Sequence, residues 1–159
     1  MYLTSKGLDV LSRQDLSAFI ARCFHELNPQ TNYLHNFHIE VIAARLEKCL
    51  RGETKRLIIN LPPRSLKSIC ASVAFPAFVL GHNPEAKIIC ASYGQKLANT
   101  LAGDCRSVMA SAWYRALFPS TRLEPRKRAV NDFKWITMIV ARPNCGESRS
   151  EPVRSTSAG

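Results

Sequence analysis

The feature that most constrains this chain is a short apolar run, residues 56–61 (RLIINL), that leads into the loop 62–68 (PPRSLKS). A continuous apolar run of this length predicts a strand buried on both faces, as in a parallel sheet. The residues after Lys67 and Ser68 predict a helix. A helix start exposes unpaired N–H groups and the positive end of the helix dipole, so a strand, a tight loop and a helix together favour phosphate binding.

The loop departs from the usual phosphate-binding pattern at its glycines. When Lys67 and Ser68 are aligned with the end of G-x-x-x-x-G-K-[ST], Leu61 and Leu66 occupy the two glycine positions. Glycine normally serves there because it accepts positive φ and lets the backbone approach phosphate closely. From these residues alone, an ordinary strand-to-helix turn that carries a solvated Arg64 and Lys67 remains an open alternative.

Periodicity and turn residues predict the remaining elements. Apolar spacing predicts helices over residues 16–27, 36–51, 68–80, 94–109 and 111–118, and strands over 87–92 and 134–140. The strand 56–61, the following helix and the strand 87–92 would form a right-handed parallel βαβ unit. The predicted fold class is therefore α/β, a P-loop NTPase-like parallel sheet with flanking helices, with an incomplete core and two preceding N-terminal helices.

The length of 159 residues suits one domain. We expect a partial ordered domain over residues 1–133 and an atypical tail over 134–159 that is disordered or out of frame. Within the tail, the Arg, Ser, Pro, Glu and Gly of residues 142–159 cannot bury enough surface to order themselves. The longest weakly polar run, residues 69–80, is too short to cross a bilayer, and the N-terminal residues lack a secretory signal pattern. The predicted location is the cytoplasm.

The net charge of +10 is placed unevenly along the chain. Residues 1–50 are neutral, residues 51–119 carry nine basic against three acidic side chains, and residues 120–159 carry eight against four. A surplus of this kind favours a polyanionic partner, through phosphate neutralisation and counterion release. An alternative function is therefore a non-enzymatic basic module that binds nucleic acid and in which the loop is purely structural.

Five segments together resemble the ATPase region of large terminase subunits, the DNA-packaging motors of tailed phages and prophages. They are residues 36–40 (NFHIE), 52–60 (GETKRLIIN), 61–68 (LPPRSLKS), 91–93 (ASY) and 113–119 (WYRALFP). A proline-proline-arginine variant of the phosphate loop is familiar in that family. The resemblance covers about residues 15–133 and implies binding of ATP and Mg²⁺.

The resemblance also implies roles for single residues. Lys67 would contact the β- and γ-phosphates, and Ser68 would hold Mg²⁺. Arg64 would stabilise charge on the transferring phosphoryl group, which makes Arg64 and Lys67 the candidate catalytic residues. Phe37 and His38 match a segment near the adenine. The main chain lining the phosphates would come from Pro63, Arg64, Ser65, Leu66 and Lys67.

The chain departs from the terminase pattern after the loop. Hydrolysis needs an acidic residue at the end of a later strand, but the run 136–140 leads to Ala141 and Arg142, and the nuclease domain of the family has no counterpart. We therefore expect a truncated or frameshifted motor fragment that binds ATP without hydrolysing it alone. Implied partners are double-stranded DNA, the small terminase subunit, the portal protein and identical subunits in a ring. A small nucleotide kinase is disfavoured because no second glycine-rich or acidic substrate loop is present.

Overall fold

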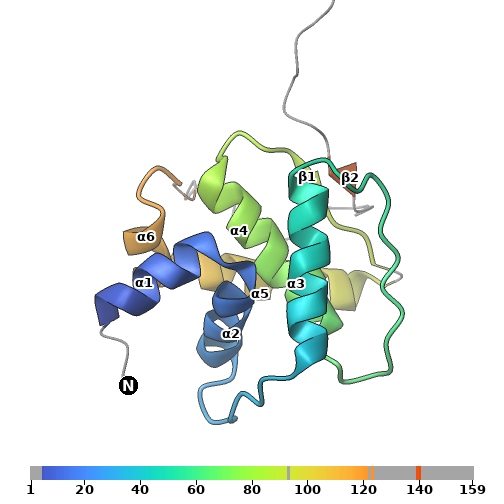
Figure 1. Ribbon diagram of the computed structural model, residues 1–159, viewed down its shortest axis with the longest axis horizontal. Coiled ribbons are helices and arrows are strands. Elements are labelled where there is room, and N and C mark those ends of the chain that lie inside the picture. The colour runs from blue at the N-terminus through green and yellow to red at the C-terminus, as the bar shows by residue number, and fades with distance from the viewer. Residues whose placement is uncertain (1–4, 93, 122, 124–138, 141–159) are drawn as a thin grey trace, which may run out of the picture.

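The computed structural model describes residues 5–92, 94–121, 123 and 139–140, and they form a helical domain (Figure 1). Its elements are the helices α1 (Ser5–Gln14), α2 (Leu16–Leu27), α3 (Phe37–Leu50), α4 (Phe75–His82), α5 (Gln95–Ala110) and α6 (Ala112–Leu117), the π-helix η1 (Ile69–Ala74), and the strands β1 (Ile88–Ile89) and β2 (Ile139–Val140). None of the described helices is both long and apolar enough to span a membrane.

The expected α/β fold with a P-loop NTPase-like parallel sheet is wrong. Within the described residues the only sheet is the pair β1 and β2, which run antiparallel with Ile88 opposite Val140. Residues 56–61 are extended but belong to no sheet, so the parallel βαβ unit does not form. Of the predicted tail 134–159, only β2 lies within the described residues.

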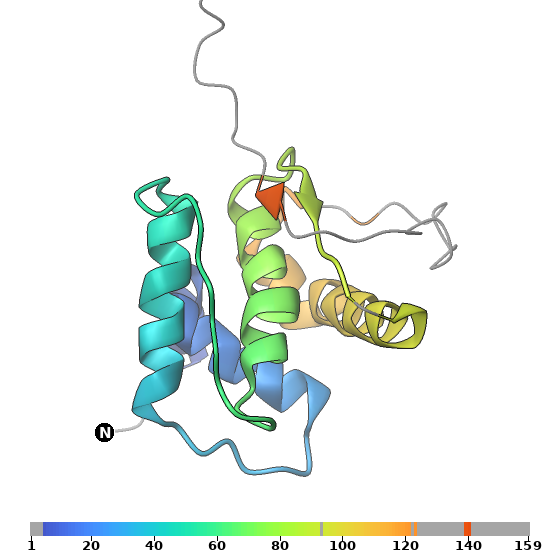
Figure 2. The same cartoon turned by 90° about the vertical axis from the view of Figure 1, so that its right-hand side faces the viewer.

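The reason for the error lies in what covers the apolar run. Leu57, Ile59 and Leu61 are half-buried against the helical core, whereas Ile58 between them is 92% exposed. The run is therefore covered on one face only, and by helices. Figure 2 shows this segment descending beside α3 toward the start of η1.

The core is built around α2, whose predicted bounds are confirmed. The carboxylate of Asp15 caps the helix by accepting a 2.6 Å hydrogen bond from the N–H of Ala18. The fully buried ring of Phe19 projects from α2 into a cluster of edge-to-face aromatic contacts. Its partners are Phe78, Trp113, Tyr114 and Phe118, with ring centroids 5.4 to 6.2 Å away.

Three helices, not two, precede the phosphate-loop segment. The additional helix is α1, and it includes Ser12, whose side chain is buried. Asp15 caps the next helix, α2. The helices predicted over residues 36–51, 94–109 and 111–118 are present as α3, α5 and α6.

The helix predicted over residues 68–80 begins with a π turn. In η1 the N–H of Phe75 bonds to the carbonyl of Cys70, five residues earlier, and η1 then continues directly into α4. The next residue, Pro76, has no N–H, and in an α-helix its ring would press against the carbonyl of Ser72. The π turn, which is wider than an α turn, lies at the position where this clash would occur.

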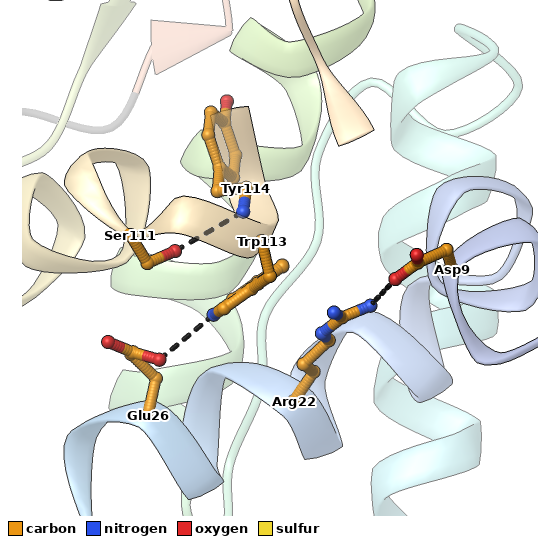
Figure 3. Close-up of polar contacts among 6 residues, drawn as sticks. All are labelled: Asp9, Arg22, Glu26, Ser111, Trp113 and Tyr114. Carbon is orange, nitrogen blue, oxygen red and sulfur yellow. Dashed lines mark hydrogen bonds and ion pairs between the residues drawn. The ribbon is translucent and has the colours of Figure 1, made fainter. Parts of the chain in front are cut away.

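A polar network ties α1, α2 and α6 together (Figure 3). The guanidinium of Arg22 makes a 2.6 Å ion pair with Asp9 and lies 4.5 Å from the ring centroid of Trp113. The indole N–H of Trp113 donates a 2.9 Å hydrogen bond to the carboxylate of Glu26. These contacts fix α6, and with it the aromatic cluster, against the N-terminal helices.

Candidate functional site

The loop between the extended segment and η1 contains two residues in the left-handed backbone region. Arg64 has φ of +64° and Leu66 has φ of +59°. Non-glycine residues rarely adopt this conformation, which costs on the order of 1–2 kcal/mol each. Leu66 occupies the position at which the usual phosphate-binding pattern has its second glycine, so it adopts the conformation that glycine normally supplies.

Side chains of the loop close it upon itself. The ammonium of Lys67 donates a 2.6 Å hydrogen bond to the carbonyl of Leu61, and the hydroxyl of Ser65 donates a 2.8 Å bond to the carbonyl of Pro62. Lys67 thus reaches back across the loop to the end of the extended segment. Its ammonium has three donors, so two N–H groups remain for a ligand.

Both ends of the loop are anchored in the fold. Leu61 and Leu66 pack against the hydrophobic core, and the N–H of Cys70 bonds to the carbonyl of Leu66 at 2.9 Å. Pro63 and Arg64 between these anchors are exposed. The loop is therefore an exposed turn held at fixed ends.

His38 of α3 contacts the loop, whereas the resemblance implied a place near the adenine. Its Nε2 lies 3.3 Å from the carbonyl oxygen of Ser65, and since a carbonyl only accepts, Nε2 carries the proton. Its neighbour Phe37 is 75% exposed at the start of α3 and is not a core residue. The structure thus places His38 beside the loop and leaves the ring of Phe37 exposed.

The charge at the loop is positive and unneutralised. The ion pairs within the described part of the chain involve Asp9, Glu40, Glu47 and Glu53, and none of these acids pairs with Arg64 or Lys67. The loop therefore carries two cations three residues apart together with two left-handed residues, a combination that favours an anionic ligand.

Ser68 is the single predicted metal ligand. It is exposed and its side chain makes no helix-cap hydrogen bond. Among the described residues no group of three or more His, Cys, Asp or Glu is arranged to hold a metal ion. Mg²⁺ commonly takes one protein oxygen together with phosphate oxygens and water, so Ser68 fits a nucleotide-borne Mg²⁺ but not an independent metal site. Hydrolysis would require an acidic residue where this sequence has Ala141 and Arg142. Both residues lie outside the described part of the chain.

The thiols do not contribute to this site. Burial raises the pKa of Cys70 to about 11 and that of Cys105 to about 12. A thiol with so high a pKa is protonated at neutral pH and is a poor nucleophile. The side chain of Cys70 lies in the hydrophobic core, and that of Cys105 packs against it.

Comparisons with known protein families, curated proteins and solved structures find no match for this chain. The function is therefore argued from the geometry of the loop and its neighbours.

Proposed function

We propose that residues 62–68 bind the phosphates of a nucleoside triphosphate, ATP with Mg²⁺, and that the chain is the ATP-binding N-terminal part of a DNA-packaging motor of the large terminase type. The bound nucleotide is held without being hydrolysed by this chain alone. The proposal requires no sheet in this chain, because it depends on the loop.

The observation that carries the proposal is the pair of left-handed residues Arg64 and Leu66. Strained backbone conformations persist where the surrounding structure holds them, and they concentrate at ligand-binding sites. Left-handed residues in a turn can direct backbone N–H groups toward a bound anion. A plain connection between a strand and a helix would not need two such residues.

Three side chains supply the remaining chemistry. Lys67, held at the carbonyl of Leu61, directs its two other N–H groups to the outer phosphates. Arg64 presents a planar guanidinium that can bind phosphate oxygens with two parallel hydrogen bonds. The hydroxyl of Ser68 supplies one ligand to the Mg²⁺ carried by those phosphates.

Phe37 and His38 extend the site toward the base. The exposed ring of Phe37 offers a flat apolar surface for stacking a purine. His38 supports the loop by donating to the carbonyl of Ser65. Its ring is thereby oriented, and it determines how far α3 lies from the loop.

Partners of the motor are part of the same proposal. Duplex DNA is the polyanion that the basic surplus after residue 50 would meet, and a small terminase subunit, a portal protein and further copies of the chain would complete the assembly. The loop residues 62–68 include no Asp or Glu, so we expect water activation to come from elsewhere in that assembly.

Calorimetric titration with Mg²⁺-ATP tests the loop. We expect Lys67→Ala to weaken binding on the order of tenfold to a hundredfold, because a charge-assisted contact to phosphate is lost. Lys96→Ala is the matched control, since this exposed lysine lies on α5 and its removal changes the net charge equally. Thermal melting of both variants separates loss of binding from loss of folding. Equal affinities of the two variants for ATP would refute the assignment.

The alternative, a basic nucleic-acid module, is supported by the +6 charge of residues 51–119. It predicts DNA binding that weakens steeply between about 50 mM and about 200 mM salt and is indifferent to ATP. In the motor, Mg²⁺-ATP changes the DNA affinity. Measuring DNA binding at both salt concentrations, with and without Mg²⁺-ATP, distinguishes the two functions.

A further inference from the structure

We infer that residues 56–61 are an open strand edge that pairs with an extended, acidic segment of a partner protein. The strand contact does not require ATP at the neighbouring loop, although Arg64 is shared by the two proposals. It rests on the backbone, the side-chain alternation and the charge of this segment.

The segment has the side-chain alternation of a strand that belongs to a half-buried sheet. Leu57, Ile59 and Leu61 are directed to the core, while Ile58 and Asn60 are exposed. Ile58 is 92% exposed, the highest value among the exposed large apolar side chains. Alternate residues of an extended chain point to opposite faces, so Ile58 marks the centre of the outward face.

The backbone of this segment has no strand partner within the described part of the chain. No N–H or C=O of residues 55–61 forms a backbone–backbone hydrogen bond there, and the carbonyl of Leu61 accepts only from the side chain of Lys67. The sheet of β1 and β2 is formed by other residues. An extended segment with an unused ladder is a template for strand addition, in which main-chain bonds give affinity and alternate side chains give specificity.

The charges around the strand specify an acidic partner. Lys55 and Arg56 lie at its start and Arg64 lies three residues beyond its end, and all three are exposed. None of them belongs to an ion pair between described residues. A partner strand with an apolar residue opposite Ile58 and carboxylates at both ends would neutralise these cations.

Charge also argues against other occupants. A second copy of the chain would bring the same cations together, and each copy has a net charge of +10. Nucleic acid would satisfy the cations but offers neither a peptide ladder nor an apolar contact for Ile58. Pro62 and Pro63 restrict the ladder to residues 56–61, because proline has no N–H to donate.

The test uses the full chain and a labelled peptide in which valine and threonine alternate between glutamates at each end. We expect saturable binding by fluorescence anisotropy, and protection of alternate amides of residues 56–61 from hydrogen exchange, because only every second N–H faces one neighbour. A peptide of the same composition with a central proline should not bind.

Two matched variants locate the contact. Ile58→Asp should weaken peptide binding by about tenfold or more, because it places a carboxylate opposite an acidic strand. Val10→Asp, which adds the same charge at an exposed apolar residue on α1, should leave it unchanged. Equal binding of the two peptides, equal loss in both variants, or protection of these amides by self-association of the chain alone would each overturn the inference.

Discussion

The phenol of Tyr114 in α6 donates a 2.7 Å hydrogen bond to the carbonyl of Ala77 in α4, inside the aromatic cluster. The Tyr114 side chain is fully buried, so this bond is shielded from water. It joins two helices through residues that are 37 positions apart in the sequence. Because α4 continues directly from η1, the bond also fixes the helix that follows the loop.

Tyr114→Phe should lower the free energy of unfolding by about 1 kcal/mol. The ring and its packing remain, but a buried hydrogen bond is lost. Urea unfolding followed by circular dichroism measures the difference. Tyr114→Leu is the comparison and should cost more, since it also removes ring contacts. A Tyr114→Phe variant as stable as the wild type would mean that the bond contributes nothing to the domain.

Gly81→Ala should destabilise the domain by about 1–3 kcal/mol through overpacking. A Cβ placed on Gly81 would lie 2.7 Å from three ring atoms of Phe118, whose side chain is buried. The ring cannot move freely because it also packs on Phe19 and Tyr114. Thermal melting of Gly81→Ala measures the effect, and Gly103→Ala serves as the control, because a Cβ there meets no atom within 4 Å. Equal melting temperatures for the two variants would contradict the tight contact.

Arg64→Gly should raise stability slightly while weakening ATP binding. Glycine accepts the φ of +64° without strain, and the relief exceeds its entropic cost by about 0.5 kcal/mol. Arg64→Ala retains the left-handed strain and should not be stabilised. Both variants lose the guanidinium, so both should bind Mg²⁺-ATP about tenfold more weakly. Unfolding and titration measured on the same pair separate strain from charge; if Arg64→Ala gained as much stability as Arg64→Gly, the strain would be refuted.

Stability should fall as pH rises above about 9. The thiols of Cys70 and Cys105 stay protonated in the folded state, with pKa values of about 11 and about 12, while in the unfolded chain they ionise near their ordinary pKa of 9.0. Above that pH the unfolded state binds fewer protons, so each thiol lowers stability by up to about 1.4 kcal/mol per pH unit. The loss ends as pH passes the folded-state pKa values.

Urea unfolding at about pH 8 and about pH 10 in reductant measures this slope. Burial also raises the pKa of Tyr114, which acts in the same direction above about pH 10. Cys70→Ala should reduce the pH dependence, although the substitution itself lowers stability. An unchanged slope in that variant would show that Cys70 does not titrate on unfolding.

The helical part of the fold could be predicted because its signals are local. In α2, apolar residues recur at helical spacing from Leu16 to Leu27, and Asp15 before them is a capping residue. Nothing outside the segment is needed to interpret that pattern. The first helix, α1, was not predicted, and two of its apolar residues, Val10 and Leu11, are exposed in the structure.

The sheet could not be predicted correctly because a strand depends on partners that are distant in sequence. Residues 57–59 are all apolar, so the sequence does not reveal that Ile58 faces outward while Leu57 and Ile59 face helices. Residues 87–92 form a strand only at Ile88–Ile89. Both segments have residues that favour strands, but the two segments do not pair with each other in the structure.

The residues of the candidate site stay a prediction from the sequence. Lys67 lies in the loop itself, and the structure adds that His38 of α3 contacts the loop carbonyl of Ser65. The left-handed conformations of Arg64 and Leu66 had no local signal, since arginine and leucine both disfavour them. A loop fixed at both ends by Leu61 and Leu66 imposes these conformations on its residues.

The number of residues in the π turn Ile69–Ala74 determines how the loop is oriented relative to α4. A π turn contains about one residue more than an α turn, and one residue corresponds to about 100° of helical rotation. Deleting one residue there would leave the loop and α4 chemically unchanged yet aim them in different directions. The contact between Ser65 and His38 therefore depends on the one additional residue of the π turn. No substitution within the loop could compensate for its loss.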